Sequence, residues 1–355
     1  MSLEARLKGQ IAAGGPLTVA QYMTICLHDP QEGYYASRPR LGEAGDFVTA
    51  PLVSQMFGEL IGLWCVEAWT RLGRPGRFLW AELGPGDGTL ISDALRAARL
   101  EPAFLKAAEL WLVEPSAPLR ELQRARLQGA PLAPAWAEDL QALPEGLPLI
   151  AVANEVLDCL PARQFVRSAA GWAERMVGLG EDGALAFGLS PRPTDLVFPE
   201  APEGAVLELS PAQEAMGSEL GRRVATDRGL VLLIDYGRAE AGFGDTLQAV
   251  RGHQRQGPLE TPGEADLTVH ADFPAVLASA RREGAAAAPV LSQREFLLRL
   301  EIEARAAALA SARPDRAEVV ARQLQRLIGE SEMGELFKAA CIHSPGVPAP
   351  AFEKG

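Results

Sequence analysis

Three glycines at alternate positions follow a short apolar run in the first third of the chain. The run Phe78-Leu79-Trp80-Ala81-Glu82-Leu83 leads into Gly84-Pro85-Gly86-Asp87-Gly88, and helical spacing resumes at Thr89. Because glycine has no Cβ atom, such a loop can come close to a ligand, and a strand, a tight loop and a helix in this order predict a small-molecule site. The alternative for the loop alone is a simple turn.

The charge beside the loop narrows the choice of ligand. The spacing Gly-x-Gly-x-Gly differs from that of dinucleotide-binding loops, and the carboxylate of Glu82 would oppose a pyrophosphate. S-adenosylmethionine fits better, since Glu82 can hold its ammonium group, directly or through water, while N–H groups at the start of the helix receive its carboxylate. We therefore expect Glu82 and the glycines Gly84, Gly86 and Gly88 to bind a methyl donor.

Three more polar residues follow predicted strands and are assigned to the same donor site. Glu114 ends the second apolar run, where an acidic side chain can accept both ribose hydroxyls. Asp139 follows the expected third strand and can meet the adenine amino group, and Asn154 ends the next strand. Taken alone, Glu114 can instead be a helix-initiating carboxylate before Pro115.

Acidic residues are the candidates for handling the methyl acceptor. Glu155 is the first choice because it emerges beside Asn154 at the carboxyl edge of the sheet, and Asp46 and Asp235 are the others. A guanidinium would need such partners, because its planar fork matches carboxylates. Asp158 is as well explained by a turn contact.

Two histidines and one arginine are further residues that could take part in the site. Arg251 and His253 lie in a glycine-rich segment after Tyr236, where they can serve as an anchor and a base or be solvated loop residues. His270 opens an expected helix at Ala271, which favours a structural role.

Continuous apolar strands alternate with helical segments, which is typical of a mostly parallel sheet covered on both faces. The expected strands are 78–83, 110–113, 149–153 and 229–234. Thr18 is the expected N-cap of a helix through His28, and Pro51 opens another through Trp69. The fold class is therefore α/β and Rossmann-like.

The expected division of the chain has three parts. Residues 1–75 form a helical extension with a lid loop, 76–290 the methyltransferase core with a β-rich insertion around 162–209, and 291–355 a helical segment packed on that core. A glycine-rich loop is expected up to Gly263, and helix from 292 to 340.

Composition sets limits on partners and compartment. The 355 residues carry a formal net charge of −12, which disfavours nucleic acid and anionic membrane surfaces and suits a basic partner. The cysteines Cys26, Cys65, Cys159 and Cys341 form no Cys-x-x-Cys pair, which argues against a metal site or disulfides. The first ten residues have no signal or transit pattern and no apolar stretch spans a bilayer, so we expect a cytoplasmic protein without membrane insertion.

Several segments resemble the MidA-type methyltransferases, a family that includes a mitochondrial complex I assembly factor acting as a protein arginine methyltransferase. The Gly-Asp-Phe-x-Thr-x-Pro and Asn-Glu-x-Leu-Asp-x-Leu-Pro segments are the most specific. The matching stretches cover nearly the whole chain and are 45–51, 82–90, 154–161, 233–237, 244–247 and 333–338.

The resemblance implies a class I methyltransferase fold with a seven-stranded sheet whose last hairpin is antiparallel, an added helical part over the donor pocket, and donor binding at the glycine loop and Glu114. It also implies an arginine of a protein, such as a respiratory complex I subunit, as acceptor. The chain departs from the family where Cys159 replaces a small residue and Asp87 a basic one. The alternatives are a donor-binding assembly protein without turnover, or a methyltransferase of another acceptor.

Overall fold

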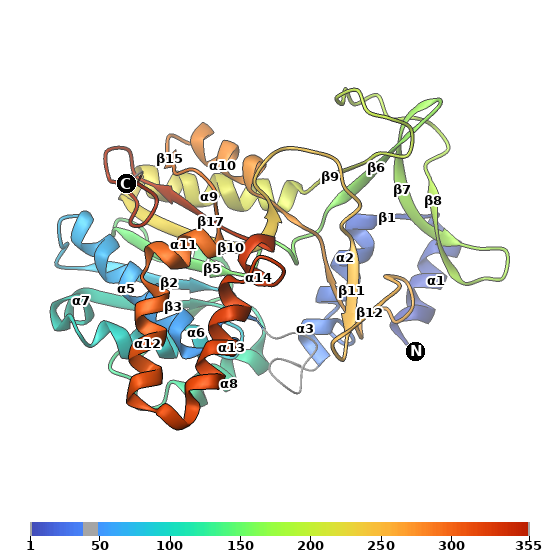
Figure 1. Cartoon of the computed structure of the whole chain (residues 1–355). Helices are drawn as coiled ribbons and strands as arrows, with labels where there is room; N and C mark the ends of the chain where they lie inside the picture. The colour runs from blue at the N-terminus through green and yellow to red at the C-terminus, as the bar shows by residue number, and fades with distance from the viewer. Residues whose placement is uncertain (1, 38–48, 354–355) are drawn as a thin grey trace.

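A mixed β-sheet forms the centre of the larger of two lobes in the computed structural model, which describes residues 2–37 and 49–353 (Figure 1). The strand order is β15-β17-β10-β5-β2-β3-β4, and β14 and β16 add short pairings to β10 and β17. The bounds are β2 Phe78–Leu83, β3 Ala108–Val113, β4 Ala135–Ala137, β5 Leu149–Asn154, β10 Gly229–Arg238, β14 Ala271–Asp272, β15 Ala286–Ala287, β16 Leu291–Ser292 and β17 Phe337–His343.

The direction of these strands follows the predicted fold class. The strands from β10 through β5, β2 and β3 to β4 run parallel to one another, whereas β17 runs antiparallel to both β10 and β15. The continuous path has seven strands, and the last pair is antiparallel. The prediction of a mostly parallel seven-stranded sheet is therefore confirmed, with two additional two-residue strands.

Both faces of this sheet are buried, with successive residues pointing to opposite sides. In β2, Trp80 packs in one core cluster, while Leu79 and Ala81 pack in the other. The helices on the first face are α4 Ala50–Val53, α5 Gln55–Arg71, α6 Thr89–Ala98, α7 Pro102–Ala107, α11 Gln293–Arg299, α12 Ile302–Ala312, α13 Ala317–Ile328 and α14 Met333–Leu336. Those on the second face are α9 Pro211–Asp227 and α10 Phe273–Arg282, and α8 Ala117–Arg126 follows β3.

Helices α5 and α6 approach each other closely at two glycines of α5. A Cβ atom at Gly62 would lie 2.5 Å from the carbonyl oxygen of Ala94, and one at Gly58 would lie 2.6 Å from Cβ of Asp93. Since α6 begins at Thr89, directly after the glycine loop, this contact fixes the end of the loop against the core.

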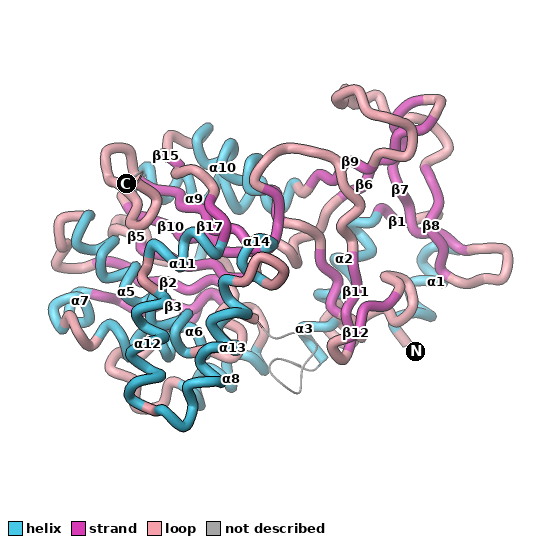
Figure 2. Tube along the Cα trace, viewed as in Figure 1, coloured by secondary structure: helices cyan, strands magenta, loops and turns pink. Residues whose placement is uncertain are grey.

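The smaller lobe combines two antiparallel sheets with the N-terminal helices, and Figure 2 shows its strands beside α1 and α2. Leu7, Tyr22, Val177 and Leu267 are among the residues of its own core. Its elements are α1 Leu3–Gly14, β1 Leu17–Thr18, α2 Val19–His28, α3 Tyr34–Ser37, β6 Arg163–Ser168, β7 Gly171–Leu179, β8 Leu185–Leu189, β9 Val206–Leu209, β11 Gln248–Arg251, β12 Gln254–Gln256 and β13 Asp266–Thr268.

This lobe is built from three stretches that lie far apart in the sequence, namely residues 3–37, 163–209 and 248–268. Helix α5 and the C-terminal helices pack instead on the sheet of the larger lobe. We therefore propose a division into two lobes in place of the parts 1–75, 76–290 and 291–355.

Several expected elements differ in the structure. The stretch expected as loop up to Gly263 contains β11 and β12, and the stretch expected as helix to residue 340 ends in β17 from Phe337. The helix expected at Ala271 begins at Phe273, with Asp272 as its N-cap. Thr18 does cap α2, by a capping box with Gln21.

The helix expected from Pro51 to Trp69 is broken at Ser54. Ser54 has an extended backbone with φ −162° and ψ 140°, and its hydroxyl accepts a hydrogen bond from the N–H of Met56, at 3.3 Å. The serine therefore ends α4 and caps α5. A serine side chain can bond to nearby backbone N–H groups and so interrupt a segment whose pattern is helical.

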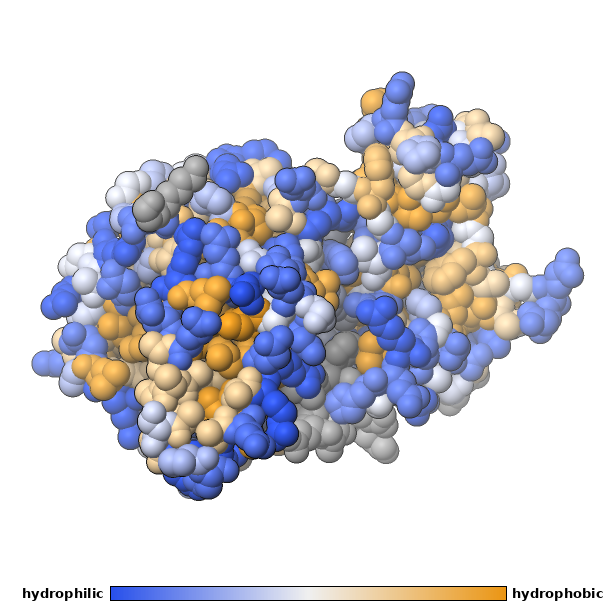
Figure 3. All heavy atoms as spheres, viewed as in Figure 1, coloured by the Kyte–Doolittle hydropathy of each residue, from blue (hydrophilic) through white to orange (hydrophobic). Residues whose placement is uncertain are grey.

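The face shown in Figure 3 is mixed, with apolar side chains gathered on both lobes among hydrophilic ones. Leu179, Phe187 and Leu189 of β7 and β8 are each more than a third exposed. In the described ranges 2–37 and 49–353, no helix has the length and apolar content needed to cross a membrane.

Candidate functional site

A cavity of about 470 Å³ lies where the two lobes meet, a volume in the usual range for small-molecule sites. The larger lobe contributes the carboxyl ends of β2, β3, β5 and β10, and the smaller lobe contributes α3 and the start of β13. None of the described residues that line it is Lys or Arg. Its acidic residues are Glu82, Asp87, Glu114, Glu138, Asp139, Glu155, Asp158 and Asp266.

The glycine loop lies on this cavity in a conformation that only glycine adopts readily. Gly84, Gly86 and Gly88 have φ values of 60°, 54° and 82°. A Cβ atom at Gly84 would lie 2.8 Å from Cγ2 of Val156. The loop is therefore a constrained cradle and not an interchangeable turn.

The acidic departure from the family at Asp87 has a partner in the structure. Its carboxylate pairs with Arg126 at 2.6 Å and accepts a hydrogen bond from the N–H of Thr89, at 3.0 Å. The side chain of Asp87 thus caps the first turn of α6, and Arg126 offsets the negative charge that it adds beside the loop.

Glu82 is the most unusual carboxylate of the cavity. Its side chain is only 3% exposed, and its Oε2 has no hydrogen-bond partner among the described residues. Burial, with the charges of Asp87 and Glu114, raises the pKa of Glu82 to about 8. A buried carboxylate oxygen without a hydrogen-bond partner lowers the stability of the fold unless a ligand bonds to it. The cationic ammonium group of the donor would be such a partner.

The raised pKa of Glu82 predicts a pH-dependent response to the donor. The pKa of Glu82 is higher in the folded chain than in the unfolded chain, so protonation of this carboxyl group favours folding. The resulting contribution to stability is fully present below about pH 4 and is lost as the pH rises through about 8. An ammonium beside Glu82 would lower its pKa, so binding of S-adenosylhomocysteine at pH 6 to 7 should release about one proton. Calorimetry in buffers of different ionisation enthalpy measures this release.

The release should vanish above about pH 9, where Glu82 is already ionised, and it should be absent from Glu82→Gln at every pH. Proton release that is unchanged in this variant would assign the titration to another group and contradict the ammonium contact.

Glu114 lies at the end of β3 and is 4% exposed. Its Oε1 accepts the N–H of Ser116 at 2.9 Å, and its Oε2 accepts Nε2 of Gln123 at 3.3 Å. Gln123 also donates to the carbonyl of Gly86 at 2.8 Å and accepts from Trp136. One hydrogen-bond network therefore links the carboxylate to the glycine loop, and the proposed ribose contact would use the remaining lone pairs.

Glu114→Gln should raise the dissociation constant for S-adenosylhomocysteine about tenfold, because hydroxyl groups bond more weakly to an amide than to a carboxylate. Glutamine keeps an oxygen for the N–H of Ser116. Calorimetric titration measures the change, with Glu109→Gln, a partly exposed residue of the same strand paired with Arg77, as the control. Equal affinity in the variant and the wild type would leave Glu114 as a residue that only starts the next helix.

Asn154 and Glu155 follow one another where β5 ends. Glu155 has a left-handed backbone, with φ 55°, and its N–H donates to the carbonyl of Ile234 at 2.9 Å. Its Oε1 accepts from Nδ2 of Asn154 at 3.0 Å and from the N–H of Ala50 at 3.3 Å. Burial, followed by the charge of Asp158, raises the pKa of Glu155 to about 8. The structure thus brings both predicted residues to the cavity.

Asp235 does not lie where a residue that binds the acceptor is expected. It does not line the cavity and is 1% exposed. Its Oδ2 accepts the N–H groups of residues 156, 157 and 158 at 3.1, 2.9 and 3.3 Å, and its Oδ1 that of Tyr236 at 2.9 Å. We therefore propose that Asp235 is a positioning residue, which holds the segment after Glu155.

The other candidates differ in their access to the cavity. Asp139 lies at its edge, where its Oδ1 caps a short 3-10 helix, Leu140–Ala142, so its contact with adenine stays a prediction. Arg251 pairs with Glu264 at 2.6 Å, and neither Arg251 nor His253 nor His270 lines the cavity. Asp46 lies outside the described residues.

Sequence reasoning missed the contribution of the smaller lobe. Tyr35 and Asp266 both line the cavity, and the hydroxyl of Tyr35 donates to Oδ1 of Asp266 at 3.3 Å. The ring of Tyr35 stacks on His28 with centroids 5.8 Å apart, and its carbonyl accepts the hydroxyl of Ser116 at 3.1 Å. The pair Tyr34-Tyr35 was noticeable in the sequence, but only its position against β13 gives it a role.

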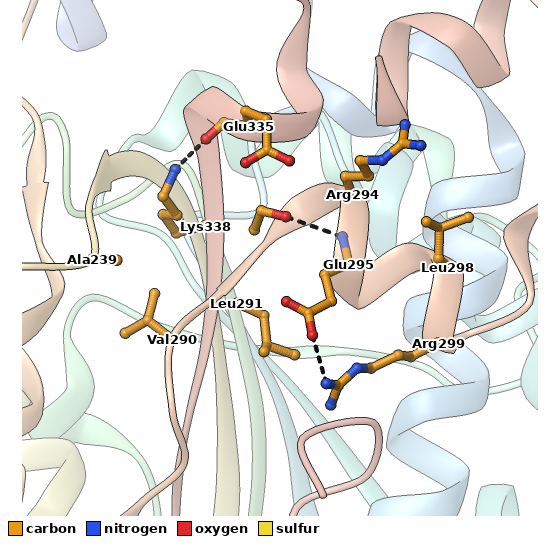
Figure 4. A pocket seen from close by; sticks show the side chains of 10 residues that line it. Ala239, Val290, Leu291, Arg294, Glu295, Leu298, Arg299, Glu335 and Lys338 are labelled. Atoms are coloured by element: carbon orange, nitrogen blue, oxygen red, sulfur yellow. Dashed lines mark hydrogen bonds and ion pairs between the residues drawn. The ribbon is translucent and has the colours of Figure 1, made fainter. Parts of the chain in front are cut away.

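A second cavity, of about 740 Å³, lies between α11 and β17, and Figure 4 shows Glu295 paired with Arg299 in it. Glu295 bonds Arg299 at 2.6 Å, Lys338 donates to the carbonyl of Glu335, and Arg294 donates to that of Ile328 at 2.7 Å. It shares no residue with the glycine loop, so we assign it no part in the chemistry.

Three features together define a class I methyltransferase that uses S-adenosylmethionine. They are the topology of the sheet, the glycine loop, and the acidic residues at the carboxyl ends of β2 and β3. A family model of S-adenosyl-L-methionine-dependent methyltransferases matches residues 60–290. The chain belongs to this family.

Relatives and solved structures agree with this classification. The chain is 34% identical to the mouse "Protein arginine methyltransferase NDUFAF7, mitochondrial" over 92% of this chain and 81% of that protein. It is 33% identical to the Drosophila melanogaster homolog over 99% and 87%. A Burkholderia thailandensis protein crystallised with S-adenosyl-homocysteine is 31% identical, with a TM-score of 0.87 over 99% of this chain and 95% of that one.

These findings correct one expectation. The curated relatives from mouse and Drosophila are both named mitochondrial, which contradicts the prediction of a cytoplasmic protein. That prediction rested on the first residues of the chain, and those residues do not determine the compartment.

Proposed function

We propose that this methyltransferase transfers a methyl group from S-adenosylmethionine to an arginine side chain of a protein. The observation that carries the proposal is the lining of the cavity, which has eight acidic residues and no Lys or Arg among the described ones. Such a lining favours a cationic acceptor, and the relatives from mouse and Drosophila are named protein arginine methyltransferases. A nucleic acid would bring phosphates toward these carboxylates.

Unsatisfied polar atoms mark where the ligands would bind. Five cavity residues have a buried side-chain atom without a hydrogen-bond partner among the described residues, namely Glu82, Thr89, Asn154, Asp158 and Tyr236. We assign Glu82, Asn154 and the glycines to the donor, with Glu114 at its ribose. Asp158 lies four residues beyond Asn154 and is left for the acceptor.

When bound, S-adenosylmethionine supplies a sulfonium methyl group, which passes to a nitrogen as the carbon–sulfur bond breaks and sulfur keeps the electron pair. Glu155 orients the guanidinium and accepts the proton that its nitrogen loses. A carboxylate with a pKa near 8 is suited to this role, because the catalytic pKa of an effective base lies near the working pH.

The experiment that tests this function uses the full chain, S-adenosylmethionine labelled in its methyl group, and a lysate of the source organism. We expect label in one or a few polypeptides, removed by protease and not by nuclease. Label only in nucleic acid or in small metabolites would refute the protein acceptor. The family resemblance adds a respiratory complex I subunit as the candidate acceptor, and mass spectrometry of the labelled polypeptide tests it.

A further inference from the structure

Two carboxylates from different lobes lie in the part of the cavity that the donor assignments leave unused. Asp158 follows β5 of the larger lobe, and Asp266 begins β13 of the smaller lobe. The N–H of Val269, three residues after Asp266, donates to the carbonyl of Asp158 at 2.9 Å. This bond ties the two segments together, so both carboxylates keep their places at the junction.

Both residues are more than nine-tenths buried, with exposures of 6% for Asp158 and 8% for Asp266. Oδ1 of Asp158 and the hydroxyl of Tyr236, which also lines the cavity, make no hydrogen bond of ordinary length among the described residues, although Tyr236 lies close enough to Asp158 to offset part of the rise in its pKa. Burial raises the pKa of Asp158. A buried carboxylate oxygen without a full hydrogen bond is stabilised by a cationic partner.

Tyr35 connects the two carboxylates. Its hydroxyl donates to Asp266, and burial, followed by Asp266, Cys159 and Asp158 in that order, raises the pKa of Tyr35, so Asp158 also lies near the hydroxyl. The stacking of Tyr35 on His28 fixes that ring from the other side. The result is a polar pocket with two carboxyl groups and an aromatic wall.

We propose that Asp158 and Asp266 together bind the guanidinium of the acceptor arginine, so that the acceptor site is complete only where the two lobes meet. This inference rests on the proposed function and adds the residues that select the substrate. A planar guanidinium has five N–H donors and can bond carboxylates along two edges, whereas the ammonium of lysine is a compact point charge. Two carboxylates therefore favour arginine over lysine.

The test measures binding of Nα-acetyl-L-arginine methylamide and its lysine counterpart to the full chain saturated with S-adenosylhomocysteine. The wild type should bind the arginine probe at least about tenfold more tightly than the lysine probe, and Asp158→Asn or Asp266→Asn should each weaken arginine binding about tenfold or more. Asparagine at 266 keeps an oxygen for the hydroxyl of Tyr35. Affinity for S-adenosylhomocysteine should stay within about twofold, which also reports that each variant is folded.

Glu264→Gln is the matched control, since this exposed carboxylate lies two residues from Asp266 and pairs only at the surface with Arg251. Wild-type protein without a preference for arginine, or variants that bind the probe as the wild type does, would overturn the assignment. The lysate labelling separates this failure from that of the proposed function: methylarginine made equally well by the variants refutes the pocket alone, and no methylarginine from the wild type refutes the function.

Discussion

Replacing Glu155 by glutamine should lower the rate of methyl transfer by about 10²–10⁴-fold, the usual contribution of a positioned general base. Affinity for S-adenosylmethionine should stay within about twofold of the wild type. The glutamine oxygen can still accept from Asn154 and from the N–H of Ala50, so the loop after β5 keeps its geometry. What the variant loses is the negative charge and the ability to take up a proton.

Single-turnover transfer with saturating labelled donor measures this effect, and Glu145→Gln, an exposed carboxylate, is the control. If Glu155→Gln transfers methyl groups at the wild-type rate, the base must be another group. If it loses donor affinity and rate together, Glu155 belongs to the donor site and not to the acceptor.

Gly86→Val should weaken binding of S-adenosylmethionine by at least about a hundredfold. Gly86 has φ 54°, a conformation that a β-branched side chain scarcely adopts, and it lies on the cavity beside the donor-binding residues. The side chain would therefore both displace the loop and occupy space that the ligand needs. The measurement is calorimetric titration, with thermal unfolding to show that the variant is folded.

Gly129→Val is the matched control for backbone strain. Gly129 also has a positive φ, of 77°, but no atom lies within 4 Å of an added Cβ, and it is exposed in a loop outside the cavity. The control should lose stability and retain donor affinity. A folded Gly86→Val protein with wild-type affinity would remove the glycine loop from the donor site.

The central strands could be predicted from the sequence because they are buried on both faces. A strand of this kind is a continuous apolar run, so the expected strand 78–83 coincides with β2 and the expected strand 149–153 with all but the last residue of β5. Ligand sites in such sheets lie at the carboxyl ends of the strands, and this rule brought Glu82, Glu114 and Glu155 to one cavity.

The smaller lobe could not be predicted in the same way, because contacts far apart in sequence assemble it. Asp266 begins a three-residue strand that has no period of its own, and it meets Tyr35 from 231 positions away. The run from Phe337 to His343 is buried strand in the sheet, although its apolar residues are equally consistent with the end of a helix.

Asp235 shows a further limit of sequence reasoning. It lies in a buried strand near the carboxyl edge of the sheet, where residues of the site are expected. Its carboxylate, however, accepts hydrogen bonds from backbone N–H groups of the neighbouring segments. Hydrogen bonds to a loop backbone depend on the path of that loop, which the residue types do not reveal.

The identity of the methylated atom tests the account most directly. Polypeptides labelled by the wild-type chain would be hydrolysed, and their methylated amino acids identified by mass spectrometry. We predict methylarginine, lost in Glu155→Gln and reduced in Asp158→Asn and Asp266→Asn. Label confined to methyllysine, or to a molecule that is not a protein, would contradict the account even if every donor-binding prediction held.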